Sequence, residues 1–119
     1  MNERAQLGQQ GERAVVEYLQ KKKFKVLATN YSTRLGEIDI IAQYQDLLVF
    51  VEVKTRTNPQ FEISSVVTHS KQRKIIAATK GYMLEHRVSN KICRFDVATV
   101  TFYNQTYAIE YIESAFYGE

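Results

Sequence analysis

Apolar and polar residues follow two different periods along the chain, and together these periods predict an α/β protein. Apolar residues recur every three or four positions over 3–23 and again over 70–87, the period of a helix that buries one face. Shorter apolar runs, rich in β-branched and aromatic residues, predict five strands. These strands span 24–28, 36–44, 47–54, 94–103 and 106–112. The predicted order is therefore helix, three strands, helix, two strands.

Polar stretches predict the connections between these elements. Asn30 to Gly36 reads as a turn, and Gln45-Asp46 and Asn104-Gln105 are each short enough to close a hairpin. Residues 55–68 have no clear period and contain the only proline, so we expect a loop there. Residues 113–119 are predicted to form an irregular tail.

Length and composition narrow the class of protein. The chain has 119 residues, a length typical of one domain, which we expect to span 1–119. No apolar run approaches the ~20 residues of a membrane-spanning helix, and the first ten residues lack the apolar stretch of a secretory signal. One cysteine, Cys93, cannot form an internal disulfide. These features favour a cytoplasmic protein that does not bind membranes.

The net charge adds little to this picture. The chain carries 16 Lys and Arg residues against 13 Asp and Glu residues, a net charge of +3. A mild basic excess of this size is compatible with nucleic-acid binding without requiring it.

Glu12 is the first charged residue at a position where packing favours an apolar one. It lies at the centre of the apolar stripe of the first predicted helix. The stripe consists of Ala5, Gly8, Val15, Val16 and Leu19. A buried carboxylate costs several kcal/mol unless it is paired or binds a metal. The alternative, the commoner arrangement for an isolated glutamate, is that Glu12 sits at a frayed end of the stripe and reaches water.

Carboxylates also interrupt two of the apolar strands. In 36–44, alternation places Asp39 on one face together with Glu37 and Ile41. The opposite face of that strand holds Ile38, Ile40 and Ala42. In 47–54, the valines share one face, and the other face carries Phe50, Glu52 and Lys54. A polar outer face is ordinary in an antiparallel sheet, so alternation alone does not indicate a site.

The expected hairpin brings the two carboxylates together. If Gln45-Asp46 is the turn, Tyr44 pairs with Leu47, and the same register places Asp39 opposite Glu52 and Glu37 opposite Lys54. Directly opposed side chains have Cβ atoms ~5 Å apart, so two like charges repel unless something positive lies between them. This geometry favours a metal site.

The types of residue indicate which metal and which reaction. Carboxylate oxygens without a cluster of His or Cys suit Mg²⁺ or Mn²⁺ rather than zinc. Such a cation lowers the pKa of a coordinated water, and the ammonium of Lys54 is close enough to orient that water or to stabilise charge on a phosphate. Phosphodiester hydrolysis is the reaction class that best uses two carboxylates, one lysine and a hard cation.

Two segments of the chain resemble a known nuclease motif. Residues 36–42 and 50–56 are similar to the PD-(D/E)xK motif, with Asp39 as its aspartate and Glu52-Val53-Lys54 as its (D/E)xK. More closely, the chain resembles the YraN-like family of small bacterial proteins, which is related to archaeal Holliday-junction resolvases. This resemblance covers residues 8–100. It also rests on Gly11-Glu12, Asn30, Lys71-Gln72 and Arg94-Phe95-Asp96-Val97.

The resemblance implies a fold and a set of site residues. The fold is a restriction-endonuclease-like αβββαβ core, with a mixed central sheet flanked by helices. The implied metal ligands are Asp39, Glu52 and the backbone carbonyl of Val53. Lys54 would assist the nucleophilic water, and Glu12 would complete the acidic cluster directly or through water.

Basic and polar residues near these segments are candidates for nucleic-acid contacts. Arg34 lies in the polar turn before the strand that carries Asp39, where a phosphate contact and a plain solvated turn are equally compatible with the sequence. Lys71, Gln72 and Lys74 begin the second helix, on the side that family analogy places near the site. The alternative is that they form a solvated basic face.

We therefore expect a Mg²⁺- or Mn²⁺-dependent endonuclease, or a nuclease-like protein, that acts on structured or branched nucleic acid, with DNA favoured. One alternative is a nucleic-acid-binding protein that keeps the fold without cleaving, and another is a structural or protein-interaction domain. Because junction resolvases cut two strands in matched positions as symmetric dimers, the resemblance is also compatible with a homodimer.

Overall fold

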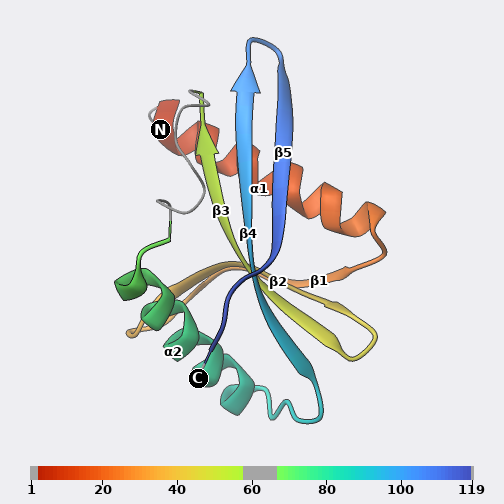
Figure 1. Ribbon diagram of the computed structural model, residues 1–119, viewed down its shortest axis with the longest axis vertical. Helices are drawn as coiled ribbons and strands as arrows, with labels where there is room; N and C mark the ends of the chain where they lie inside the picture. The colour runs from red at the N-terminus through yellow and green to blue at the C-terminus, as the bar shows by residue number, and fades with distance from the viewer. Residues whose placement is uncertain (1–2, 58–66, 119) are drawn as a thin grey trace.

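The part of the chain that the structure describes folds into two helices and five strands (Figure 1). The computed structural model describes residues 3–57 and 67–118. The elements are α1 (Glu3–Lys21), β1 (Lys25–Ser32), β2 (Glu37–Tyr44), β3 (Leu47–Arg56), α2 (His69–Glu85), β4 (Ile92–Tyr103) and β5 (Thr106–Phe116). This order confirms the predicted one. Most of the loop expected at 55–68 lies outside the described residues.

The strands form one mixed sheet in the order β1-β2-β3-β4-β5. β3 and β4 are parallel, whereas the other three neighbouring pairs are antiparallel. Parallel neighbours need a crossover connection, and α2 lies within the one that joins β3 to β4. The mixed sheet with packed helices confirms the predicted fold class. Neither described helix combines the length and the apolarity that a membrane crossing requires.

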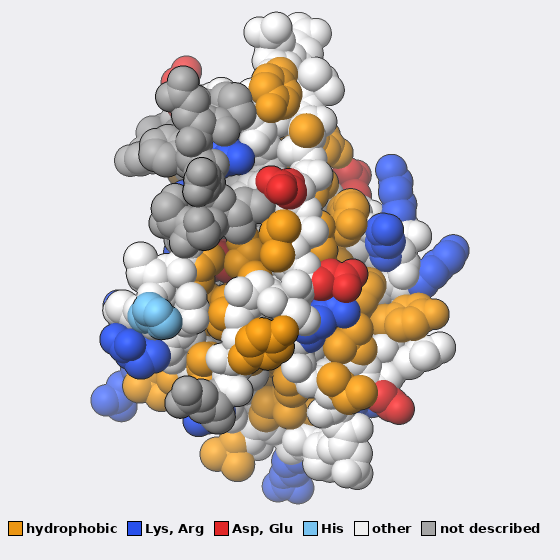
Figure 2. Space-filling view, viewed as in Figure 1, with side chains coloured by type: hydrophobic (Ala, Val, Ile, Leu, Met, Phe, Trp, Pro, Cys, Tyr) orange, Lys and Arg blue, Asp and Glu red, His pale blue; other side chains and the backbone are white. Residues whose placement is uncertain are grey.

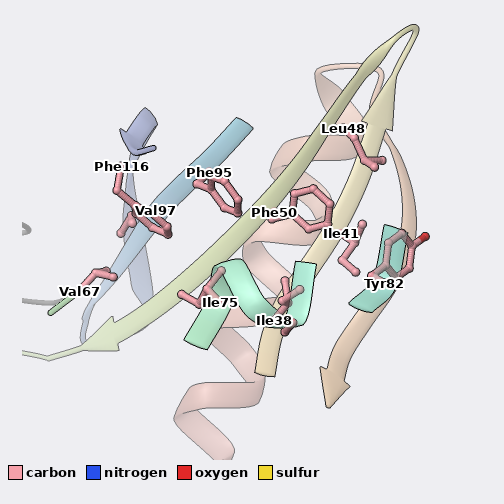
Figure 3. Packing of buried hydrophobic residues seen from close by; sticks show 11 residues of the cluster. Ile38, Ile41, Leu48, Phe50, Val67, Ile75, Tyr82, Phe95, Val97 and Phe116 are labelled. Carbon is pink, nitrogen blue, oxygen red and sulfur yellow. The ribbon is translucent and has the colours of Figure 1, made fainter. Parts of the chain in front are cut away.

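Each face of the sheet is covered by one helix, and each helix seals a separate apolar cluster. α1 packs on the face formed by alternate strand residues such as Val49, Val51 and Val100. α2 packs on the other face, where Ile75 and Tyr82 lie over Phe50 (Figure 3). The alternation expected for β3 is thereby confirmed, because its valines and Phe50 face opposite helices.

β1 is longer than the sequence predicts. We expected a turn from Asn30 onward, but β1 continues to Ser32, and Tyr31 and Ser32 pair with Ile38 and Glu37 of β2. Asn30 has a positive φ of 52°, which interrupts the regular strand without ending its pairing. The turn itself is confined to residues 33–36.

β5 is also longer than predicted, because residues expected in a tail continue the strand to Phe116. The backbone N–H of Ser114 donates to the buried carboxylate of Asp96 at 2.9 Å, and Ser114 has a positive φ of 53°. The register between β4 and β5 shifts at this point, between Phe95 and Val97. This irregularity hides the strand from a period-2 pattern.

Candidate metal centre

β2 and β3 separate at one end of their shared ladder, and this separation creates the site. Backbone pairing follows the predicted register from Tyr44–Leu47 to Ile40–Val51, where the ladder ends. β3 continues to Arg56 with β4 as its neighbour. The predicted register is confirmed over these five pairs, but it does not extend to Asp39 and Glu52 as ladder partners.

The side chain of Asp39 occupies the gap left where the ladder ends. The backbone N–H of Val53 donates to Asp39 Oδ2 at 2.8 Å, a hydrogen bond that a neighbouring strand would otherwise provide. A strand residue directs its N–H and C=O to the same edge, so the carbonyl of Val53 faces the same gap. Asp39 therefore takes the role of a backbone partner and stays beside the end of β3.

Near the end of the ladder, the structure contradicts the predicted orientation of Ile38. We predicted that Ile38 shares a face with Ile40, but Ile38 packs in the α2-side cluster, near Ile75, while Ile40 packs on the α1 side (Figure 3). β2 no longer pairs with β3 at this point and continues beside β1 alone. The side chain of Ile38 there belongs to the core on the α2 side.

Two glycines allow the helices to approach the gap from opposite faces. A Cβ at Gly11 of α1 would overlap the Thr55 hydroxyl of β3, and a Cβ at Gly36 would overlap the backbone carbonyl of Lys74 in α2. Both positions thus require a residue without a side chain. The close approach places Glu12 and the first turns of α2 at the edge of the gap.

Asp39 and Glu52 form a close carboxylate pair. Glu52 is buried, with 5% of its side chain exposed, and Lys71 Nζ of α2 forms an ion pair with its Oε2. Burial, together with the charge of Glu52 and a side-chain hydrogen bond with it, raises the pKa of Asp39 well above its ordinary value of 3.8. The hydrogen bond from Val53 opposes this shift. Without a cation, the site therefore favours a proton on Asp39 over two negatively charged carboxylates side by side.

Among the described residues, Lys71 is the cation that forms an ion pair with Glu52. Burial lowers its pKa, but the hydrogen bond and charge of Glu52, followed by the charges of Asp39 and Glu37, outweigh burial and raise it. Its side chain is nevertheless about half exposed. Lys71 is thus placed to leave Glu52 without disturbing the core.

Glu12 reaches the same region from α1. It is half-buried, and Asn30 Nδ2 donates to its Oε1 at 2.9 Å. Burial raises the pKa of Glu12, the Asn30 hydrogen bond opposes the shift, and the charges of Glu37 and Glu52 add to it. Glu12 is therefore neither at a frayed helix end nor fully solvated.

The donor set fits a hard cation with few protein ligands. Within residues 3–57 and 67–118, no three Asp, Glu, His or Cys side chains lie close enough together to hold a metal ion. Mg²⁺, however, is usually held by one or two carboxylates, with waters and substrate phosphates completing its shell. Asp39, Glu52 and the carbonyl of Val53 would supply such a set, and Glu12, bonded to Asn30, would act through water.

A groove of about 1320 Å³ runs past the carboxylate pair between α1 and the start of α2. Its volume exceeds the 300–1,000 Å³ typical of small-molecule pockets. Three of the predicted site lysines line it, namely Lys54, Lys71 and Lys74. The face shown in Figure 2 carries Lys and Arg side chains mostly along its periphery, with a smaller blue area next to acidic side chains near its middle.

Two predicted nucleic-acid contacts lie apart from this groove. Gln72 Nε2 donates to the backbone carbonyl of Val67 at 3.1 Å, so its amide holds the entry to α2. Arg34 is exposed in the turn between β1 and β2. For both residues, contact with nucleic acid stays a prediction.

Sequence reasoning missed the parts of the site that position its carboxylates. It assigned no role to Asn30, which orients Glu12, or to Gly11 and Gly36, which permit the close approach of the helices. One signal was available, because Gly11 directly precedes Glu12 and Gly36 lies three residues before Asp39.

Comparison with known proteins matches the chain to one family. The model described as "Uncharacterised protein family UPF0102" matches residues 11–100. A UPF0102 protein of Alkaliphilus oremlandii is 42% identical over 113 residues, covering 92% of this chain and 97% of the relative. One from Geobacter metallireducens is 41% identical, covering 92% and 91%. One from Flavobacterium psychrophilum is 39% identical and covers 98% of both chains.

Proposed function

The chain belongs to the uncharacterised protein family UPF0102, and from its carboxylate site we propose that it is a Mg²⁺- or Mn²⁺-dependent endonuclease acting on structured or branched DNA. Family membership agrees with the resemblance to the YraN-like family drawn from its motifs. The further relationship to PD-(D/E)xK nucleases and archaeal Holliday-junction resolvases is part of this proposal, as is a restriction-endonuclease-like character of the fold.

The observation that carries the proposal is the pair formed by half-buried Asp39 and buried Glu52 at the fork between β2 and β3. A protein gains no stability from placing a half-buried Asp39 beside a buried Glu52, whose charge helps to raise the pKa of Asp39, and such perturbed groups are typical of functional sites. The pair opens on a groove whose lining carries four basic side chains and five carboxylates. A bound cation would offset the carboxylates, and the lysines would then contact the phosphates of an anionic polymer. Carboxylates that hold a cation and lysines that contact phosphates are groups that metal-dependent phosphodiester hydrolysis can use.

The residues of the site would divide the reaction between them. When bound, the cation supplies positive charge that acidifies water and offsets the charge of the phosphate. Asp39 and Glu52 would hold it, with the Val53 carbonyl at the same edge. Lys54, exposed in the groove two residues beyond Glu52, would orient the attacking water and stabilise the developing charge on phosphate. Lys71 would exchange Glu52 for a substrate phosphate.

A second function is favoured by one specific contact. The ion pair between Lys71 and Glu52 already neutralises part of the carboxylate charge without any metal. A protein that binds DNA but does not cleave it would keep this pair in place. Its DNA binding would weaken steeply with salt, and no metal-dependent product would form.

Cleavage of labelled DNA tests the proposal and separates these two functions. The substrates are a four-way junction, a flap, a single strand and a duplex, each incubated with Mn²⁺, Mg²⁺ or EDTA. We expect a metal-dependent product from the wild-type protein, with branched DNA preferred. Asp39→Asn and Glu52→Gln should abolish the product.

The role of Lys54 is tested in the same assay against a matched lysine. Lys54→Met should lower the cleavage rate at least 100-fold, because a positioned acid–base or charge-stabilising group contributes about 10²–10⁴-fold. Lys80→Met, which removes an exposed lysine of α2 outside the groove residues, should leave the rate unchanged. Salt-sensitive binding without any product from the wild-type protein would favour the non-cleaving alternative.

A further inference from the structure

Leu35 is a large apolar side chain exposed beside the proposed DNA groove. It is 63% exposed and belongs to neither apolar cluster. It occupies the turn between β1 and β2, and the next residue, Gly36, lines the groove. Single exposed leucines are common on protein surfaces, so exposure alone does not indicate a function for Leu35. The rigidity and the position of its turn are the further observations.

The turn that carries Leu35 is held rigidly by Thr33. The Thr33 hydroxyl oxygen accepts hydrogen bonds from the backbone N–H groups of Leu35 and Gly36 at 3.0 and 3.1 Å. The same hydroxyl donates to the carbonyl of Gly36 at 3.0 Å, and the backbone N–H of Thr33 donates to that carbonyl at 2.8 Å. Four hydrogen bonds therefore fix a turn of four residues.

The turn is also anchored against α2. Gly36 lies so close to the carbonyl of Lys74 that no side chain would fit between them. Lys71 lies about one helical turn before Lys74, and both lysines line the groove. Leu35 therefore extends from a rigid turn that lies next to Lys71 and Lys74, the two lysines of α2 that could contact phosphates.

The distance from Leu35 to the carboxylate pair matches a short stretch of nucleic acid. Asp39 lies four positions after Leu35, at most ~13 Å along an extended strand. At ~3.4 Å per base step, this distance corresponds to about four base steps. Phosphates held by Lys71 and Lys74 would bring bases of the same stretch within reach of Leu35.

From these observations we infer that Leu35 is a wedge that inserts between bases at the branch point of a DNA substrate and selects branched DNA over continuous duplex. The inference rests on the proposed binding of DNA in the groove, and it does not require hydrolysis. Apolar side chains inserted between base steps unstack them at a cost of a few kcal/mol. The cost is least where bases are already unpaired, so such a wedge favours a branch.

Fluorescence of 2-aminopurine tests the wedge without depending on cleavage. The base analogue, whose emission rises on unstacking, is placed at the branch point of a four-way junction and, in a second substrate, within a continuous duplex. Binding is measured in EDTA, so that no hydrolysis takes place. We expect the wild-type protein to increase emission from the junction and to bind it more tightly than duplex.

Leu35→Ser is the decisive variant, and Leu84→Ser is its control. Leu84 is 82% exposed near the other end of α2, so both changes remove an exposed leucine and should leave the melting temperature unchanged. Leu35→Ser should abolish the rise in emission and reduce the preference for junction over duplex about tenfold. Leu84→Ser should retain both. Thr33→Ala, which loosens the turn, should lower the emission rise with Leu35 still present.

Two outcomes would overturn the wedge. One is an emission rise in Leu35→Ser equal to that of the wild type, and the other is no rise when the wild-type protein binds the junction. Both leave the proposed nuclease intact, since cleavage is measured separately. Absence of cleavage with a Leu35-dependent emission rise would contradict the nuclease and retain the wedge.

Discussion

Asp39 has two roles that depend on its protonation state. Its carboxylate accepts the backbone N–H of Val53, and it lies against the carboxylate of Glu52. The first contact favours the charged form of Asp39, and burial and the second contact disfavour it. Since the net effect raises the pKa, the folded protein without metal binds a proton that the unfolded chain releases.

The stability of the metal-free protein should therefore depend on pH through Asp39. Because its pKa is raised on folding, the free energy of unfolding should fall as pH rises from the ordinary value of 3.8 to the raised pKa, and then level off. The slope for one proton is at most about 1.4 kcal/mol per pH unit. Asp39→Asn, which keeps an acceptor for Val53, should flatten this slope and be more stable than the wild type above neutrality.

Urea unfolding in EDTA between pH 5 and 9 measures this effect. Asp46→Asn is the control, because Asp46 lies exposed in the turn between β2 and β3, and it should retain the wild-type slope. An Asp39→Asn variant with the same pH dependence as the wild type would show that Asp39 does not titrate in this window.

Lys71 should compete with a divalent cation for Glu52. Its ammonium forms an ion pair with Glu52 in the metal-free protein, and a bound cation would have to displace or share that partner. Lys71→Met should therefore increase the affinity for Mn²⁺ several-fold, as measured by calorimetry. Lys74→Met removes a lysine of the same groove that forms no ion pair with Glu52, and it should change the affinity less. Weaker binding in Lys71→Met would contradict the competition.

At the scale of elements, the site depends on how α1 and α2 close on the end of the β2–β3 ladder. The period of α1 and the two-residue hairpin turn predicted the helix and the register of the pair correctly. The end of the ladder was not predictable, because pairing rules extend a register as long as residues remain. Close approaches at Gly11 and Gly36 depend on tertiary packing, which no local pattern records.

Replacing Gly11 tests the approach of α1. In Gly11→Ala the new methyl group would overlap the Thr55 hydroxyl, so α1 must move away from β3. Overpacking of this kind typically costs about 1–3 kcal/mol of stability. The shift should also displace Glu12 and weaken Mn²⁺ binding.

Gly8→Ala is the matched control in the same helix. A Cβ at Gly8 meets nothing within 4 Å, so the change should stabilise the protein by up to about 1 kcal/mol through helix propensity. Urea unfolding of the two variants gives the comparison directly. Equal stability of Gly11→Ala and Gly8→Ala would show that the contact between α1 and β3 is not tight.

At the scale of the whole molecule, the sheet separates two apolar clusters, and residues of both helices line the groove at the fork. α1 contributes Glu12 from one face, and α2 contributes Lys71 from the other. Asp39 and Glu52 lie between them because β2 and β3 separate there. Both apolar clusters thus support one site. The two strand segments predicted Asp39 and Glu52 as its carboxylates, but the packing of the two helices that surrounds them is not specified by those segments.

The central claim is that a divalent cation binds where Asp39 and Glu52 meet. Calorimetric titration of the full chain with Mn²⁺, in two buffers of different ionisation enthalpy, measures the affinity and the protons released. We predict binding that strengthens as pH rises, because Asp39 must lose its proton. Asp39→Asn and Glu52→Gln should abolish it, whereas Glu110→Gln, at an exposed position of β5, should not. Binding of equal affinity in all four proteins, or none in the wild type, would contradict the metal centre.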